Sequence, residues 1–221
     1  MVTVITIDGP SGAGKSTVSR KLASILGYDY IDSGALYRIV ALKAIQRKIE
    51  ENNEDDLLRI CKSLEVTFFN ENGKHKILCQ GQDISDFIRA PEISMLASRI
   101  SARKVIRDQL TALQRRMGKT GRIVLEGRDA GTVVFPEASV KFFLDATAEE
   151  RGRRRFKELK LKGINVNLEQ TTRDIIKRDH NDRSRRHAPL VPAPDAVIID
   201  SSAMTVEEVA SRMMEVIQLK K

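Results

Sequence analysis

The sequence predicts an α/β fold, with a five-stranded parallel sheet flanked by helices and a small antiparallel β insertion. Five short apolar segments rich in β-branched residues recur along the 221 residues, and segments with helical spacing separate or follow them. Strands that alternate with helices form parallel sheets covered on both faces, because each right-handed crossover packs a helix on the sheet. No repeat, low-complexity tract or linker interrupts the pattern, so residues 1–221 are expected to form one domain.

The five predicted strands are short, as expected for buried parallel strands. The first ends at Asp8-Gly9, where a glycine-rich loop begins. The strands are expected at residues 2–7, 28–31, 122–125, 140–144 and 196–199.

The helices are predicted from apolar spacing and from their end signals. Apolar residues at helical spacing after the glycine-rich loop predict a first helix that stops at Gly27. Thr147 and Thr205 each stand three residues before a glutamate, and this Ser/Thr-x-x-Glu arrangement satisfies orphan amides at the start of a helix. A helix is therefore expected to follow each threonine.

Residues 33–120 are expected to be an insertion in this alternating pattern. Within them, residues 64–88 predict a β hairpin with a turn at Asn72-Gly73, two residue types that tolerate positive φ. Two apolar stripes that differ in phase then predict either two helices or one kinked helix. The first stripe contains Ile93, Leu96, Ala97 and Ile100, and the second contains Ile106, Leu110, Leu113 and Met117.

The charge balance predicts an anionic ligand. The net charge is +8, and residues 149–187 supply 13 basic and 7 acidic side chains, or +6 of that charge. Aromatic residues are only 5% of the chain, and a nucleic-acid surface usually interleaves its charge with stacking aromatics. We therefore expect a compact polyanion and no stable nucleic-acid partner.

The remaining composition indicates a cytoplasmic protein. No apolar run approaches the ~18 residues of a membrane span, so no membrane partner is expected. Cys61 and Cys79 lack the neighbours that a zinc site requires, which favours a reducing compartment. We expect the protein to be a monomer.

A phosphate-binding motif follows the first predicted strand. The run Gly9-Pro10-Ser11-Gly12-Ala13-Gly14-Lys15-Ser16 matches G-x-x-x-x-G-K-[ST] in the required strand–loop–helix context. The loop amides and the helix N-terminus cradle phosphates, Lys15 reaches the β and γ phosphates, and Ser16 offers an oxygen to Mg²⁺. ATP with Mg²⁺ is the expected ligand.

The phosphate motif alone leaves GTPases, ATPases and small-molecule kinases open. No Asn-Lys-x-Asp guanine signature occurs, which weakens the GTPase interpretation. The segment DSGALYR places Ser33 and Arg38 at the end of the next strand, where they could hold a second phosphate. In the alternative interpretation, Ser33 caps a helix and Arg38 is solvated.

Four motifs in a fixed order make the chain resemble the bacterial cytidylate kinases, P-loop kinases of the nucleoside monophosphate kinase superfamily. These motifs are GPSGAGKST, DSGALYR, EGRDAGTVVFP and RDHNDRSR. The resemblance implies transfer of the γ-phosphoryl group of ATP to CMP or dCMP in pyrimidine metabolism. It also implies a core of residues 1–32, 121–147 and 188–221, a monophosphate-binding insertion at 33–120 and a lid at about 148–187.

The resemblance also implies roles for individual residues. Lys15, Arg154 and Arg185 would be catalytic, and Ser16 would bind Mg²⁺ with ATP. The ATP site would contain Gly9, Pro10, Ser11, Gly12, Ala13, Gly14, Lys15, Ser16, Thr17 and Arg154. The CMP site would contain Ser33, Arg38, Ser98, Arg107, Arg128, Asp129, Arg178, Asp182 and Arg185. Glu126 stands where the family commonly has an aspartate, so no metal role is carried over to it.

Alternatives remain for the basic segments and for the substrate. The arginines and aspartates of 178–185 would also fit an ion-pair ladder on a solvated helix, and the arginines of 151–155 a solvated basic face. Within that second group, Arg154 and then Arg151 are the candidates for contacting ATP. A kinase of UMP or of another metabolite would share the phosphate loop, and a basic nucleic-acid-binding protein regulated by ATP would share the pI near 9.6.

Overall fold

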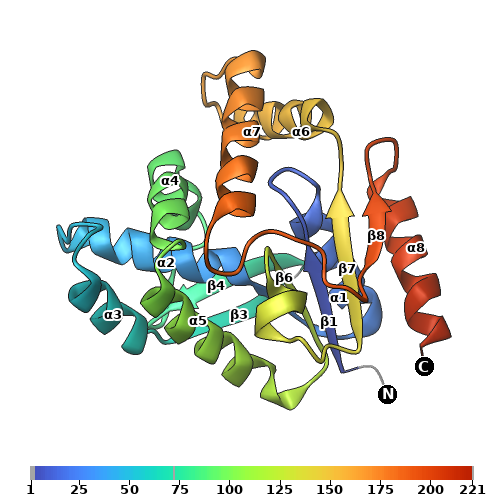
Figure 1. Ribbon diagram of the computed structural model, residues 1–221, viewed down its shortest axis with the longest axis horizontal. Coiled ribbons are helices and arrows are strands. Elements are labelled where there is room, and N and C mark those ends of the chain that lie inside the picture. Colours follow the sequence, from blue (N-terminus) through green and yellow to red (C-terminus); the bar gives the residue numbers. More distant parts are fainter. Residues whose placement is uncertain (1–2, 72, 221) are drawn as a thin grey trace.

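A five-stranded parallel sheet forms the centre of the computed structural model, which describes residues 3–71 and 73–220 (Figure 1). The strand order is β2-β6-β1-β7-β8, and every neighbouring pair is parallel. All five predicted strands are confirmed, with ends that differ by one or two residues, and Val2 lies outside the described residues. The strands are β1 (Val4–Asp8), β2 (Asp29–Asp32), β6 (Ile123–Gly127), β7 (Val140–Asp145) and β8 (Val197–Asp200).

The register of the sheet brings the carboxyl ends of three strands together. Asp8 of β1 is paired with Gly127 of β6, and Asp32 of β2 is paired with Glu126 of β6. Because the strands are parallel, the polar residues that end them meet at one edge of the sheet, where α/β proteins bind ligands.

Helices cover the sheet and its edges. α1 (Lys15–Leu26) and α8 (Val206–Leu219) pack against β1 and β7 in one apolar cluster. The short π-helical turn Ala130–Val134 packs against β2 and β6 in a separate apolar cluster. The other helices are α2 (Ser33–Gln46), α3 (Glu54–Lys62), α4 (Pro91–Ile100), α5 (Lys104–Met117), α6 (Ala148–Leu161) and α7 (Leu168–Ser184).

The capping predictions are confirmed. Thr147 accepts a hydrogen bond from the Glu150 amide at 3.3 Å, and Thr205 forms a reciprocal capping box with Glu208. Gly27 ends α1 with φ 64°, a left-handed conformation that suits glycine.

The insertion has its own apolar core, built from α2 to α5 and one side of a small antiparallel sheet. β3 (Val66–Glu71) pairs with β4 (Lys74–Cys79), as the hairpin prediction requires, although Asn72 lies outside the described residues. The structure adds a third strand, β5 (Gln82–Asp83), because Gln80 and Gly81 both have positive φ and turn the chain back. The two apolar stripes are two helices, α4 and α5.

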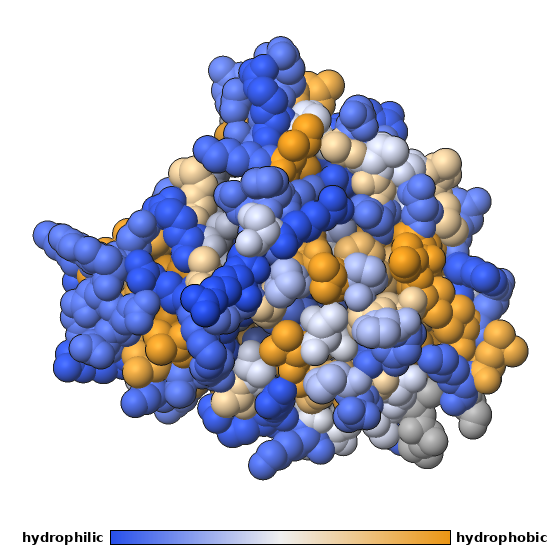
Figure 2. Space-filling view, in the orientation of Figure 1, coloured by the Kyte–Doolittle hydropathy of each residue, from blue (hydrophilic) through white to orange (hydrophobic). Residues whose placement is uncertain are grey.

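Polar residues dominate the face of the molecule shown in Figure 2. Apolar side chains gather on its right side, over β8 and α8, where Ile198 and Leu219 are exposed. In the described part of the chain, the helices are too short or too polar to cross a membrane.

α6 and α7 form a helical hairpin that is tightly packed at Gly152. A Cβ built on Gly152 would lie 2.2 Å from Thr172 Oγ1 and 2.9 Å from Thr172 Cβ. We therefore expect Gly152→Ala to push α7 away and to lower the free energy of unfolding by about 1 to 3 kcal/mol, the usual cost of overpacking. Urea unfolding measures this change, with exposed Lys157→Ala on α6 as the control. Unchanged stability would contradict the tight contact.

Candidate active site

One cavity of about 770 Å³ lies at the carboxyl edge of the parallel sheet. It is bounded by the phosphate loop, the start of α2, the end of β6, and parts of α4 to α7. Of the residues assigned from the sequence to the ATP and CMP sites, Gly9 and Pro10 do not line it. The others all do, and they are Ser11, Gly12, Ala13, Gly14, Lys15, Ser16, Thr17, Ser33, Arg38, Ser98, Arg107, Arg128, Asp129, Arg154, Arg178, Asp182 and Arg185.

The phosphate loop has the backbone that its glycines permit. Gly9 adopts φ 147°, and a Cβ there would lie 2.0 Å from the carbonyl oxygen of Leu144, so only glycine allows this close approach. Gly14 is in the left-handed region at φ 89° and supplies no side-chain cap to α1. The first amides of α1 therefore remain available to an anion.

Lys15 crosses the phosphate loop beneath the cavity. Its Nζ donates to the carbonyl oxygen of Pro10 at 2.7 Å, and the side chain is buried. Burial, followed by the positive charge of Arg128, lowers the pKa of Lys15 below its usual range. A phosphate group would supply the negative charge that this buried amine lacks.

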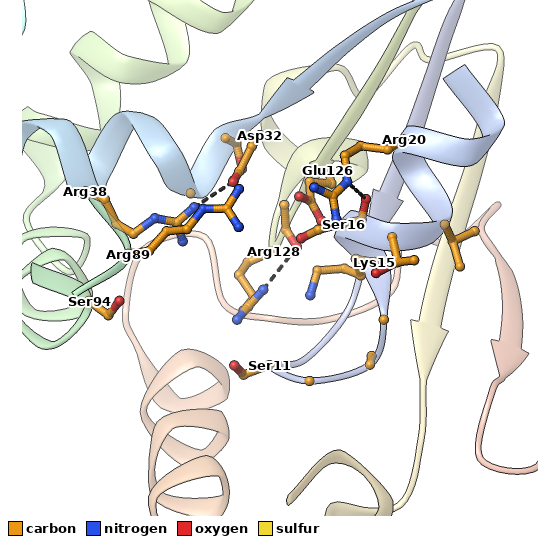
Figure 3. A pocket seen from close by; sticks show the side chains of 18 of the residues that line it. Ser11, Lys15, Ser16, Arg20, Asp32, Arg38, Arg89, Ser94, Glu126 and Arg128 are labelled. Carbon is orange, nitrogen blue, oxygen red and sulfur yellow. Dashed lines mark hydrogen bonds and ion pairs between the residues drawn. The ribbon is translucent and has the colours of Figure 1, made fainter. Parts of the chain in front are cut away.

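One carboxylate, that of Glu126 at the end of β6, stands beside Ser16. Glu126 is buried and accepts a hydrogen bond from the hydroxyl of Tyr30, and Figure 3 shows it next to Ser16. Burial, followed by the charge of Asp32, raises the pKa of Glu126. Oxygen donors with excess negative charge fit Mg²⁺, which prefers such ligands.

Four arginines surround a second part of the cavity, and they are Arg38, Arg128, Arg178 and Arg185. Arg38 donates to Asp32 at 2.6 Å, and Arg128 donates to Asp182 at 2.9 Å. Arg89, which sequence reasoning missed, also lines the cavity and is labelled in Figure 3. The alternative in which Ser33 caps the helix and Arg38 is solvated is wrong. The Asp32 side chain caps α2, Ser33 is the first residue of that helix, and Arg38 is paired with Asp32.

This arginine group has more positive charge than its acidic partners neutralise. Within the described residues, Arg38 Nε, Arg178 Nε and Arg185 Nη2 are buried without a hydrogen-bond partner. Burial, followed by the charge of Arg128, lowers the pKa of Arg178 to about 10. Buried donors without acceptors are costly, so these groups are arranged for an anion.

The predicted side-by-side arrangement on one helix holds for part of the RDHNDRSR segment. Arg178 and Asp182 lie on α7, whereas Arg185 is the residue directly after its end. Arg185 Nη1 still lies 3.6 Å from Asp182 Oδ1, so all three line the cavity. The segment is therefore not a solvated ion-pair ladder.

A buried ion pair closes the far end of the cavity. Arg107 donates to Asp129 and to the carbonyl oxygen of Ser101, the latter at 2.9 Å. The guanidinium also lies over the Tyr37 ring, 5.5 Å from its centroid. Ser98, on α4, lines the same end. Fixed donors and acceptors of this kind recognise the polar edge of a planar ligand.

The arginines at the start of α6 have different surroundings. Arg154 lies beside the phosphate loop, where its Nη1 would be 3.8 Å from a Cβ on Gly14, and it donates to the carbonyl oxygen of Ser201 at 2.6 Å. Arg151 is buried and donates to the carbonyl oxygen of Ser11 at 3.0 Å. Arg153 is exposed and pairs with Glu150. Of the two arginines favoured from the sequence, only Arg154 lines the cavity.

Asp8, the last residue of β1, binds the backbone that follows Asp129. Its carboxylate accepts from the amides of Ala130 and Gly131 at 2.8 and 2.7 Å. Burial raises the pKa of Asp8 to about 6. Asp8 therefore fixes the turn that follows Asp129, which sequence spacing could not reveal.

Comparisons with known proteins agree with this geometry. The model of a family described as cytidylate kinase matches residues 5–219. A cytidylate kinase of Geobacter sulfurreducens is 52% identical over 215 residues, which are 97% of this chain and 92% of that protein. A protein named cytidylate kinase 1 from Haemophilus influenzae is 46% identical over 97% of this chain and 93% of its own length.

Solved structures share the fold at low identity. A shikimate kinase from Bacteroides thetaiotaomicron has a TM-score of 0.50 at 13% identity, and an uncharacterized protein from Eubacterium ventriosum has a TM-score of 0.55 at 11% identity. Each alignment covers 98% of both chains. The fold is thus one that kinases use, and the full-length sequence matches are more specific: the chain belongs to the cytidylate kinase family.

Proposed function

We propose that the protein transfers the γ-phosphoryl group of ATP to CMP or dCMP, giving ADP and CDP or dCDP. One observation carries this proposal beyond family membership. A single cavity contains both a phosphate loop and a separate group of arginines with unpartnered buried donors. Two anion sites in one cavity fit a reaction between two nucleotides.

The donor half is the phosphate loop with the start of α1. ATP would lie along Gly9, Pro10, Ser11, Gly12, Ala13, Gly14, Lys15, Ser16 and Thr17, with Arg154 beside the loop. The oxygen of Ser16, with Glu126 next to it, suits Mg²⁺. When bound with ATP, Mg²⁺ supplies neutralisation of phosphate charge.

The acceptor half is the arginine group with the buried ion pair. Arg38, Arg128, Arg178 and Arg185 would hold the acceptor phosphate together with Ser33, and Asp182 would hold the ribose. Ser98, Arg107 and Asp129 would recognise cytosine, because a carboxylate accepts from its amino group and an arginine donates to its carbonyl oxygen and ring nitrogen. Uracil reverses part of this pattern.

Catalysis would rest on position and charge. Phosphoryl transfer needs little covalent chemistry from the protein, so Lys15, Arg154 and Arg185 would act by neutralising charge as the group moves in line. The insertion 33–120 and the lid 148–187 would close over the core and exclude water, which protects ATP from hydrolysis.

We place this activity in pyrimidine metabolism in the cytoplasm, with the protein acting as a monomer and without a nucleic-acid partner. The two free cysteines, Cys61 and Cys79, are both buried and fit a reducing compartment.

Product analysis tests the reaction directly. Incubation of the protein with ATP, Mg²⁺ and CMP is expected to give equal amounts of ADP and CDP. The amounts of both products are measured by ³¹P NMR. Release of inorganic phosphate in place of CDP would contradict the proposal.

Base recognition is tested at Asp129. Asp129→Ala removes the acceptor for the cytosine amino group and leaves Arg107 unpaired, so the CMP-over-UMP ratio of kcat/KM is expected to fall roughly 10- to 100-fold. Asp108→Ala, at an exposed carboxylate on α5, is the matched control. An unchanged ratio in Asp129→Ala would show that another group recognises the base.

A further inference from the structure

Asp179 lies on α7 between two residues assigned to the acceptor site, yet its side chain meets the donor site. Its Oδ1 accepts a hydrogen bond from the Ser11 amide, with 3.3 Å between N and O. Its Oδ2 accepts from Arg151 Nη1. Asp179 and Arg151 are both 5% exposed, so this contact is shielded from solvent.

Arg151 completes a closed set of contacts around Ser11. Its Nη1 donates to the carbonyl oxygen of Ser11 at 3.0 Å as well as to Asp179. Its Nε donates to the carbonyl oxygen of Ala146, the residue directly after β7, at 2.8 Å. Both polar backbone groups of one phosphate-loop residue are therefore held by side chains from α6 and α7.

The α6 backbone also presses against the loop. A Cβ on Gly12 would lie 2.9 Å from the carbonyl oxygen of Arg151. Figure 3 shows Ser11 at the tip of the loop, beside the helix drawn in pale orange, which is α7. The tip is thus confined by contacts from both helices of the hairpin.

Asp179 lies on the same helix as residues assigned to the acceptor site, so its contacts with the phosphate loop link the two halves of the cavity. Arg178 precedes it and Asp182 follows one turn later, and both line the acceptor part of the cavity. One helix therefore carries acceptor residues and, on its buried stripe, a carboxylate bound to the donor loop. Shifting α7 relative to Ser11 would change the distance between the two substrates.

We propose that Asp179, held by Arg151, is a positioning residue that fixes α7 against the phosphate loop and so sets the separation of donor and acceptor phosphates. This inference rests on the proposed function. In-line transfer is sensitive to such placement, because a misplacement of about 1 Å can cost 10²-fold in rate.

The direct test is Asp179→Asn, which keeps the size of the side chain and removes its charge. We expect kcat to fall at least tenfold, while KM for ATP and KM for CMP each change less than threefold. Glu169→Gln, in an exposed pair with Arg173 on the same helix, is the matched control and is expected to keep wild-type kcat. A purely structural role would lower the unfolding temperature but leave the kcat of the folded enzyme unchanged, and that result would overturn the proposal.

A double-mutant cycle adds a second route. If Asp179 acts through Arg151, then Asp179→Asn combined with Arg151→Gln should lower kcat no further than the worse single variant. Multiplied effects would mean that the two residues act separately and would overturn the joint role.

A measurement on the wild-type protein covers the case in which the variants do not fold. The Ser11 amide should exchange its hydrogen slowly by NMR, because it donates to the carboxylate of Asp179, a residue that is shielded from solvent. Rapid exchange, as in an open loop, would overturn the contact. Wild-type protein without CMP-dependent ADP release would instead refute the proposed function, whereas active wild type with fully active Asp179→Asn would refute only this inference.

Discussion

Replacing Lys15 with alanine is expected to lower kcat by about 10³-fold or more. Lys15 is buried, and its amine donates to the Pro10 carbonyl oxygen within the loop that would hold the β and γ phosphates. Charge developing on the transferred group must be neutralised in a site that excludes water, and such contacts are worth several kcal/mol. A coupled assay of ADP release with saturating ATP and CMP measures the loss.

The matched control for this variant is Lys21→Ala. Lys21 lies on the same helix but is partly exposed and pairs with Glu207, far from the loop. Its removal should leave kcat within about twofold of wild type, since exposed pairs contribute little. If Lys15→Ala keeps more than about a tenth of wild-type turnover, the role of the loop in holding ATP is wrong.

Arg178→Ala is expected to have opposite effects on activity and on stability. Arg178 has a buried Nε without a hydrogen-bond partner, and burial beside Arg128 lowers its pKa to about 10. In the ligand-free protein this charge is a cost, so its removal should leave the unfolding temperature unchanged or raise it. Because we assign Arg178 to the acceptor phosphate, its loss should lower kcat/KM for CMP about 10²- to 10³-fold.

Both halves of this result can be measured on one preparation. Differential scanning calorimetry gives the unfolding temperature, and initial rates at varied CMP give kcat/KM. Arg173→Ala, an exposed arginine on the same helix, controls for loss of a positive charge. A strongly destabilised Arg178→Ala, or one with normal kcat/KM, would show that this arginine has a structural task.

The features that could be predicted from the sequence are those encoded within a few consecutive residues. The loop Gly9 to Ser16 and the caps at Thr147 and Thr205 depend on fixed short spacings, and the structure has them as expected. The third strand of the insertion was not predicted, because it depends on positive φ at Gln80, a residue type that gives no such signal.

The side-chain partners across the cavity could not be predicted, because they depend on how distant segments pack. Arg151 and Arg154 stand in one basic run, yet Arg151 is buried under Ser11 and Arg154 lines the cavity. Asp8 and Asp179 meet amides 122 and 168 residues away in the chain. The only local signal for Asp179 was its place on the stripe with Ile175 and Asp182, which turns out to be buried.

The acceptor preference tests the central claim most directly. ADP release from ATP and Mg²⁺ should be measured with CMP, dCMP, UMP, AMP, GMP and dTMP added separately, against a blank without acceptor. We expect stimulation chiefly by CMP and dCMP, since we assign recognition of the cytosine edge to Arg107 and Asp129. Equal rates with all acceptors, or a rate no higher than the blank, would contradict the assignment of the arginine-lined half of the cavity to a cytidine monophosphate.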